Sequence, residues 1–219
     1  MLGITLLPEY IQSEGIERLL DNLLKRAPVT AISTSPYVMS ELPAEQGGAR
    51  EPPADAEKGL VRLLDRPLWG KREVWIETAP SFEPNLELYK GLRYQPTEPT
   101  DLTKSEGPII DTFIEAAQAR GIKIYFQIQS AIPPGYRVQF GGPIGDDTPR
   151  LPDGSIPSQR LDKNGSLASP HIIEYGEALI KDLLQRYSTI DGIRIDWPEY
   201  PPYFLDAVFT DFGPHVETF

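Results

Sequence analysis

The stretch Ile190–Tyr203 reads Ile-Asp-Gly-Ile-Arg-Ile-Asp-Trp-Pro-Glu-Tyr-Pro-Pro-Tyr and decides the predicted fold. Its first part predicts a strand with Ile193 and Ile195 on one face, because side chains alternate along a strand. Arg194 and Asp196 share the other face, where unpaired charge is costly to bury, and a proline two residues later ends the strand. A carboxylate at the C-terminal end of a strand, followed by an acidic and aromatic loop, is how α/β barrels build active sites. The stretch therefore predicts a barrel strand that ends in a site.

Strands and helices alternate upstream of this stretch. The predicted strands span Gly3–Leu7, Val29–Thr34 and Ile122–Gln129. The predicted helices run from an N-cap at Ser13 to Arg26, from a Thr103/Glu106 capping box to Gly121, and from Ser169-Pro170 to Tyr187. Each helix carries one apolar stripe at helical spacing. Such alternation implies a parallel sheet with crossover connections.

Two long stretches rich in proline and glycine interrupt the alternation, at Val38–Asp101 and Ala131–Leu167. Glu73–Thr78 alternates within the first of them and predicts a strand. We expect it in a hairpin with Val61–Leu64, although a place in the main sheet is the alternative. Long loops on a rigid scaffold commonly carry function, and these contain aromatic and charged side chains.

We predict one α/β domain over residues 1–219, namely a β/α half-barrel of four or five units with long Pro/Gly-rich βα loops. A complete barrel takes about 250 residues, and this chain of 219 spends much of its length on loops. The sequence is therefore expected to be truncated at its C-terminus. The alternative is an open, doubly wound sheet.

Composition excludes several classes of function. The net charge of −11 argues against a nucleic-acid partner. No apolar run is long enough to span a membrane, no signal peptide is visible and there is no cysteine, so a cytoplasmic protein is expected. Motifs for nucleotides or metals are lacking, so no cofactor and no metal are predicted. An open sheet edge would allow self-association.

The segment Tyr187–Pro202 resembles the fourth strand of barrel-type glycoside hydrolases. Residues 191–196, Asp-Gly-Ile-Arg-Ile-Asp, are similar to the amylase-type pattern Gly-x-Arg-x-Asp. Bacterial glycosyl-hydrolase-like proteins are closer still, and the residues that match them are Asp191, Gly192, Asp196, Trp197, Tyr200 and Pro201, with Asn164–Pro170 before the helix. The resemblance implies that Asp196 is the nucleophile or a charge stabiliser and that Arg194 orients it.

The sequence also departs from that pattern. The third predicted strand ends in Gln127-Ile-Gln129-Ser-Ala, without the Asp and Asn-His that amylase-type enzymes place there. Their acid and third carboxylate come from strands five and seven, which this chain is not expected to contain.

Nine residues form the predicted site. The catalytic candidates are Asp196 and Glu199, and the substrate-binding candidates are Arg194, Trp197, Tyr200, Gln127, Gln129, Glu9 and Tyr37. Carboxyl pairs hydrolyse glycosides, aromatic rings stack on sugars, and strand-end amides bind hydroxyl groups. Structural roles are the alternatives: an Arg194–Asp196 ion pair, a solvated Glu199, aromatic loop core and a hydrogen-bonded layer of glutamines.

Two further groups are given structural interpretations. Asp146-Asp147 is interpreted as a solvated pair rather than a metal site, and His171 as a helix-capping or packing residue. The predicted function is therefore action on a small-molecule or oligosaccharide substrate as a glycoside hydrolase. The alternatives are a non-catalytic carbohydrate-binding or sensing barrel and a different barrel enzyme, of the sugar isomerase or aldolase type.

Overall fold

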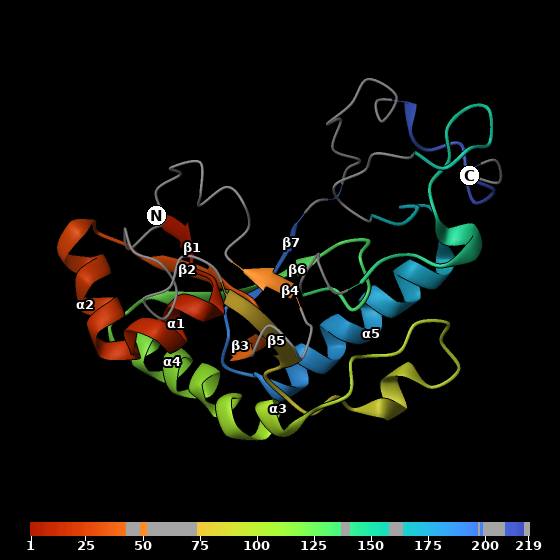
Figure 1. Cartoon of the computed structure of the whole chain (residues 1–219). Coiled ribbons are helices and arrows are strands. Elements are labelled where there is room, and N and C mark those ends of the chain that lie inside the picture. Colours follow the sequence, from red (N-terminus) through yellow and green to blue (C-terminus); the bar gives the residue numbers. More distant parts are fainter. Residues whose placement is uncertain are drawn as a thin grey trace. The chain divides into compact units, whose positions relative to one another are not determined.

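The computed structural model describes residues 1–42, 49–51, 74–136, 141–157, 164–196, 198 and 209–216. The chain divides into two compact units (Figure 1). Unit 1 comprises Met1–Glu83 and Glu98–Tyr125, and unit 2 comprises Pro84–Thr97 and Phe126–Phe219. Among the described residues, every helix is too short or too polar to serve as a membrane span.

Unit 1 begins with a parallel pair of strands. β1 (Gly3–Thr5) pairs with β2 (Ala31–Thr34), with Gly3 opposite Ala31. All of β2 is buried, whereas β1 leaves two of its three residues exposed. The sequence suggested a buried strand at Gly3–Leu7, and this is wrong for β1, which among the described strands lies at the edge of the sheet beside β2.

Two helices connect β1 to β2, where the sequence predicted one. α1 (Pro8–Glu14) and α2 (Ile16–Arg26) meet at Gly15, whose φ of 79° interrupts the helix. Glycine adopts this left-handed conformation at no steric cost. The predicted N-cap at Ser13 is wrong, since Ser13 lies inside α1. The predicted apolar stripe is confirmed at the buried residues Leu19, Leu20 and Leu23.

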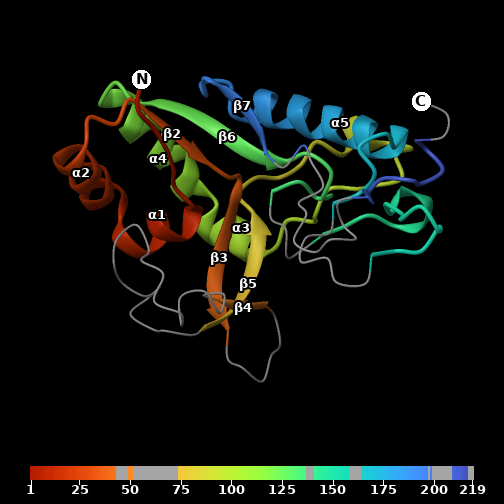
Figure 2. The ribbon, with the colours of Figure 1, turned by 90° about the horizontal axis from the view of Figure 1, so that it is seen from above.

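A second, antiparallel sheet follows β2 in the chain. β3 (Tyr37–Leu42) pairs with β5 (Val74–Pro80) over its whole length, and β4 (Ala49–Glu51) pairs with the other side of β5 (Figure 2). The strand predicted at Glu73–Thr78 is confirmed over its described residues, from Val74 onward, and so is its place outside the main sheet. Its predicted partner Val61–Leu64 lies outside the described residues, and within them β5 pairs with β3 and β4.

The cap of the next helix differs from the prediction. In α3 (Asp101–Glu106) the N-cap is Thr100, whose hydroxyl accepts a hydrogen bond from the Leu102 amide. Thr103 closes the capping box by accepting from the Thr100 amide at 3.0 Å. The predicted Thr103/Glu106 box is therefore wrong by one turn, because Thr103 is the third residue of the helix.

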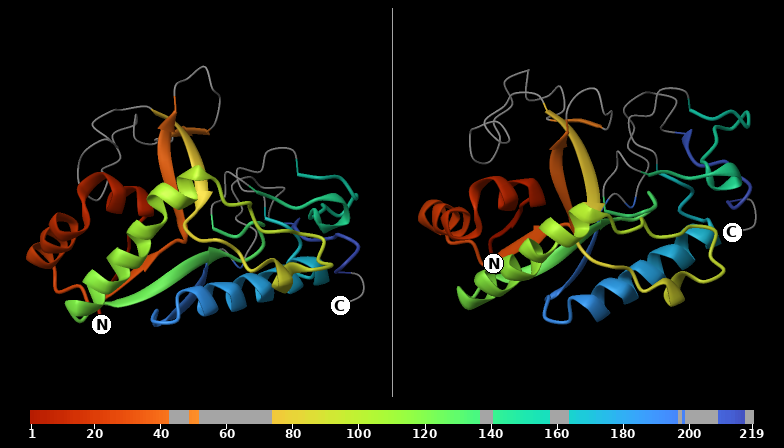
Figure 3. Two further views of the ribbon diagram at one scale, coloured as in Figure 1. Left: turned by 90° about the horizontal axis from the view of Figure 1, so that it is seen from below. Right: turned by 60° about the horizontal axis from the view of Figure 1, so that its bottom comes forward.

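α4 (Pro108–Ala119) supplies the longest buried stripe of unit 1. Its buried residues are Ile110, Phe113, Ile114 and Ala117, which confirms the predicted stripe. The helix packs against α1 and α2 (Figure 3). Arg120, directly after α4, donates a hydrogen bond of 2.6 Å to the carboxylate of Glu17 in α2.

Strand β6 (Lys123–Gln129) leads from unit 1 into unit 2. The strand buries Ile124, Phe126 and Ile128 and leaves the alternating residues Tyr125, Gln127 and Gln129 half-buried, as predicted. Gln127 and Gln129 therefore lie on the opposite face from the isoleucines. This alternation turns two amides away from the apolar core at the end of the strand.

Helix α5 (Pro170–Arg186) and strand β7 (Gly192–Asp196) follow in unit 2. The hydroxyl of Ser169 caps α5 by accepting from the Ile172 amide, which confirms the predicted N-cap. The predicted stripe is also confirmed, and its buried residues are Ile172, Tyr175, Leu179, Leu183 and Tyr187. In β7, Ile195 is 53% exposed and lines an open apolar hollow of about 220 Å³ beside α5.

The order of the main sheet is β1-β2-β6-β7, with the strands parallel. The beginning of β6 lies beside β2, since the Lys123 amide donates a hydrogen bond to the Thr30 carbonyl. The end of β6 lies beside β7, since the Ser130 amide donates to the Asp196 carbonyl. Consecutive strand–helix units thus lie next to each other, as they do in a β/α barrel, whereas a doubly wound sheet reverses its order. The described strands do not close a barrel, so the half-barrel stays a prediction.

A buried carboxylate fastens the segment Pro84–Thr97 to α5 within unit 2. Asp182 accepts hydrogen bonds from the Asn85 amide at 3.1 Å and from the Tyr89 hydroxyl at 2.9 Å. Burial raises the pKa of Asp182, which is 2% exposed, and burial together with this carboxylate raises the pKa of Tyr89.

We expect Asp182→Ala to lower the free energy of unfolding by about 2–4 kcal/mol, because the buried Tyr89 hydroxyl and the part-buried Asn85 amide lose their acceptor. Urea denaturation followed by circular dichroism measures the effect. The control is Glu177→Ala on the same helix, which removes an exposed carboxylate that pairs with Lys181 at 3.4 Å and should change little. Equal stability of the two variants would contradict the structural role of Asp182.

Candidate functional site

The ends of β6 and β7 bring together three of the predicted site residues. The side-chain amide of Gln127 donates a hydrogen bond to Oδ2 of Asp196. Oδ1 of the same carboxylate lies 3.9 Å from the guanidinium of Arg194. The three side chains come from neighbouring strands and share the face opposite Ile128 and Ile195. The structure thus brings these three candidates together, and their roles in a site stay predictions.

The Arg194–Asp196 pair is not buried. The side chain of Arg194 is 51% exposed and that of Asp196 is 22% exposed. A long ion pair in contact with solvent contributes little to stability. The ion pair that is the structural alternative is therefore present, but it is long and in contact with solvent.

Gln129 carries a second amide at the C-terminal end of β6. Its Oε1 is buried and has no hydrogen-bond partner in the described part of the chain. Its backbone amide is used, since it donates to the carbonyl of Gly135. A buried acceptor of this kind suits a ligand with hydroxyl donors, because a buried acceptor that makes no hydrogen bond carries a free-energy cost.

Glu9 and Tyr37 belong to the interior of unit 1. Glu9 is 3% exposed and Tyr37 is 2% exposed, and the Tyr37 hydroxyl donates to Oε2 of Glu9 at 2.9 Å. This bond links α1 to β3 and satisfies two buried polar groups. Their predicted contact with substrate stays a prediction. Glu199, Trp197 and Tyr200 lie outside the described residues.

A second polar cluster, which the sequence did not predict, surrounds Asp147 in unit 2. Asp147 ends the short helix Gly145–Asp147, and its side chain is fully buried. Its Oδ2 accepts from the Tyr94 hydroxyl at 2.7 Å and from Arg93 at 2.9 Å. Its Oδ1 accepts from the Ser169 hydroxyl. The interpretation of Asp146-Asp147 as a solvated pair is wrong for Asp147, because its carboxylate is buried and accepts hydrogen bonds from two other segments of unit 2. Asp146 is half-exposed.

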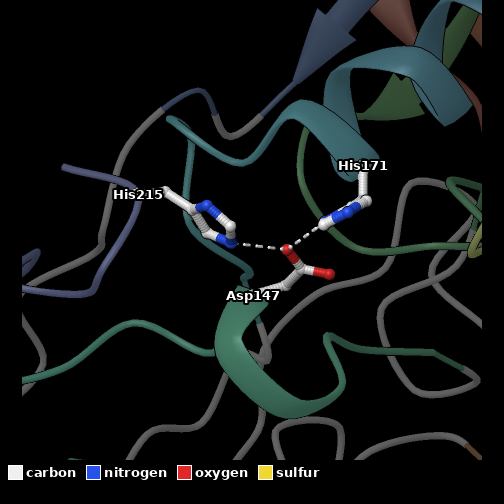
Figure 4. A group of neighbouring side chains, drawn as sticks. All are labelled: Asp147, His171 and His215. Atoms are coloured by element: carbon white, nitrogen blue, oxygen red, sulfur yellow. Dashed lines mark hydrogen bonds and ion pairs between the residues drawn. The ribbon is translucent and has the colours of Figure 1, made fainter. Parts of the chain in front are cut away.

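Both histidines of the chain complete this cluster (Figure 4). Nδ1 of His171, in the first turn of α5, lies 3.1 Å from Oδ1 of Asp147. Nε2 of His215 lies 3.0 Å from the same oxygen. The two imidazole rings meet edge-on, with their centroids 5.7 Å apart. His171 is thus a partner of a buried carboxylate as well as a helix-terminal residue.

The electrostatics of the cluster favour the ionised carboxylate. Burial alone would raise the pKa of Asp147, but hydrogen bonds from four neighbouring side chains lower it to about 2. Burial and the Asp147 carboxylate raise the pKa of Tyr94. Hydrogen bonds to Asp146 and Asp147 raise the pKa of Arg93. The carboxylate is therefore charged at neutral pH and is held in one orientation.

Among the described residues, one group could hold a metal ion: Asp147, His171 and His215, whose ligand atoms lie within 4.8 Å of one another. The sequence did not reveal it, because the ligands are separated by 24 and 44 positions and form no short motif. The signal in the sequence that could have pointed to this group is that a metal site with nitrogen ligands would have to use His171 or His215, the two histidines of the chain.

Comparison with the models of known protein families, with curated proteins and with solved structures gives no match for this chain. The likeness of Tyr187–Pro202 to glycoside hydrolases therefore stays a prediction from the sequence.

Proposed function

We propose that this chain is a glycoside-hydrolase-like protein of the β/α barrel type. In this proposal carbohydrate binds at the C-terminal ends of β6 and β7, and Asp196 acts as the nucleophile or stabilises developing positive charge. The consecutive order of the four parallel strands supports the barrel type. In barrels the ligand sites lie at the C-terminal ends of the strands, which is where Asp196 lies.

The observation that carries the proposal is the hydrogen bond from Gln127 to Asp196. It fixes one oxygen of a partly buried carboxylate and so sets the direction of the other oxygen, Oδ1. Arg194 lies 3.9 Å from Oδ1, which is too far for a hydrogen bond between the two. An oriented carboxylate that is reachable from solvent is what attack on a sugar carbon, or stabilisation of an oxocarbenium ion, requires.

The neighbouring amides suit a sugar. Gln127 supplies an oriented amide and Gln129 a buried carbonyl acceptor at the same strand end. Carbohydrates present hydroxyl groups that both donate and accept, and a few convergent polar groups fix their orientation. Gln127 is a positioning residue in this scheme, since it acts on the reacting atoms through Asp196.

Hydrolysis needs a second carboxyl group, about 5 Å away for retention and about 6.5–9.5 Å away for inversion. Glu199 is the candidate from the sequence. Without a working partner of this kind the same site would bind carbohydrate and not cleave it, which is the first alternative. A Schiff-base aldolase is less well supported, because Lys123 begins β6 and lies at the opposite end of the strand from Asp196.

The test combines hydrolysis and binding. The whole chain is incubated with chromogenic α- and β-glycosides while released sugar is quantified, and calorimetric titrations use matching oligosaccharides. We expect turnover of at least one glycoside class. Binding without turnover would favour the carbohydrate-binding alternative, and the absence of both would contradict the proposal.

A further inference from the structure

We propose that Asp147, His171 and His215 form a binding site for a divalent transition-metal ion such as Zn²⁺. The site lies within unit 2 and is independent of the proposed action on carbohydrate. It would join the short helix Gly145–Asp147, the first turn of α5 and the segment 209–216 through one ion.

The ligand set determines the class of ion. Two imidazole nitrogens and one carboxylate oxygen are the donors that Zn²⁺ and Fe²⁺ accept, whereas Mg²⁺ and Ca²⁺ prefer oxygen alone. Three protein ligands leave at least one position for water, as in open zinc sites. The side chains of His171 and His215 are 30% and 15% exposed, so an ion can reach the cluster from solvent.

The distances between the ligand atoms fit a shared ion. The nitrogens of His171 and His215 lie 3.1 and 3.0 Å from Oδ1 of Asp147. Ligands at about 2.0–2.1 Å around a tetrahedral zinc ion are separated by about 3.3 Å. Small movements of the imidazole rings would therefore admit the ion. Figure 4 shows that both rings direct a nitrogen toward the same carboxylate oxygen.

The surroundings of Asp147 are those of a metal-binding carboxylate. Tyr94 and Arg93 bind Oδ2, and Ser169 binds Oδ1, so three outer groups orient the ligand. Such outer partners tune metal affinity by about 10–100-fold. With neutral histidines, the charges of Asp146, Asp147 and Arg93 add to −1 − 1 + 1 = −1. A divalent cation therefore enters a site of favourable sign.

The composition of the chain makes the test sharp. The two histidines of the cluster are the only ones in the sequence, and there is no cysteine. Untagged protein, freed of metal with EDTA and dialysed, is titrated with ZnCl₂ by calorimetry. We expect one high-affinity site per chain, and a Co²⁺ complex whose visible absorption is displaced by Zn²⁺. Excess Mg²⁺ should not compete.

Two variants on separate elements assign the ligands. His215→Ala and His171→Ala should each weaken Zn²⁺ binding by about 100-fold or more, and Ser169→Ala, which removes an outer partner, by about tenfold. Asp153→Asn is the control, because it removes an exposed carboxylate outside the cluster and should bind Zn²⁺ like the wild type. Circular dichroism of the metal-free proteins checks that the variants are folded.

Binding to wild type that is lost in both folded histidine variants supports the site. No binding to wild type at a hundredfold excess of Zn²⁺, or unchanged affinity in His171→Ala and His215→Ala, would overturn it. In that case the cluster is a hydrogen-bonded anchor for Asp147 only. Glycoside turnover is not a readout of this experiment, so its result does not depend on the proposed function.

Discussion

Asp196→Asn is expected to reduce glycoside turnover by about 10³-fold or more while leaving the protein folded. Asparagine has the shape of aspartate, and its carbonyl can still accept the hydrogen bond from Gln127. The variant loses the negative charge that attacks the sugar or stabilises the oxocarbenium ion. The loss should therefore appear in kcat, with a smaller change in KM, when initial rates are measured on the best substrate of the glycoside panel.

Asp191→Asn is the matched control for this measurement. Asp191 is exposed and directly precedes β7, at the opposite end of the strand from Asp196. Its replacement should leave kcat within about twofold, because surface substitutions away from a site have small effects. Unchanged turnover in Asp196→Asn would show that Asp196 is not catalytic. Restoration of turnover in Asp196→Ala by azide would identify Asp196 as a nucleophile rather than a charge stabiliser.

The elements that the sequence predicted well are those whose pattern is local. β6 alternates apolar and polar residues, and α4 and α5 carry regular stripes, so periodicity alone identifies the buried faces. Asp196 and Gln127 followed from the same rule, because residues on one face of adjacent parallel strands meet at the strand ends. The strand-end site is thus a consequence of alternation in two strands.

The errors arose where structure depends on partners far along the chain. β3 pairs with β5, which lies more than thirty residues further along the chain, and the sequence of Tyr37–Leu42 does not indicate which segment it pairs with. The break at Gly15 depends on one backbone angle. Asp147 was misread for the same reason, since its side-chain partners come from three separate segments, at residues 93–94, 169–171 and 215, and an acidic pair beside glycine is typical of a solvated turn. Burial of a charge can be predicted only when its partners are known.

Asp147→Ala is expected to lower the free energy of unfolding by about 3–5 kcal/mol at pH 7 in EDTA. The substitution removes a fully buried carboxylate, leaves the buried hydroxyls of Tyr94 and Ser169 without this acceptor, and leaves Arg93 with Asp146 alone. Urea denaturation followed by circular dichroism gives the value. Asp146→Ala is the control, because it removes the adjacent, half-exposed carboxylate that also binds Arg93 and should be far milder. Equal effects of the two substitutions would contradict the anchoring role of Asp147.

The same carboxylate should make the protein acid-labile in EDTA. The pKa of Asp147 is lowered from 3.8 to about 2 in the folded state, so the unfolded state binds the proton more readily. The stability that this shift contributes is complete above the unfolded value and is lost as the pH falls from about 4 to about 2, an amount of about 2.5 kcal/mol. Asp147→Asn has no proton to bind and should lack this part of the pH dependence. The free energy of unfolding is measured against pH for wild type and Asp147→Asn. Equal slopes below pH 4 would show that the charge of Asp147 does not stabilise the fold. A shallower slope in the variant would assign this part of acid unfolding to Asp147.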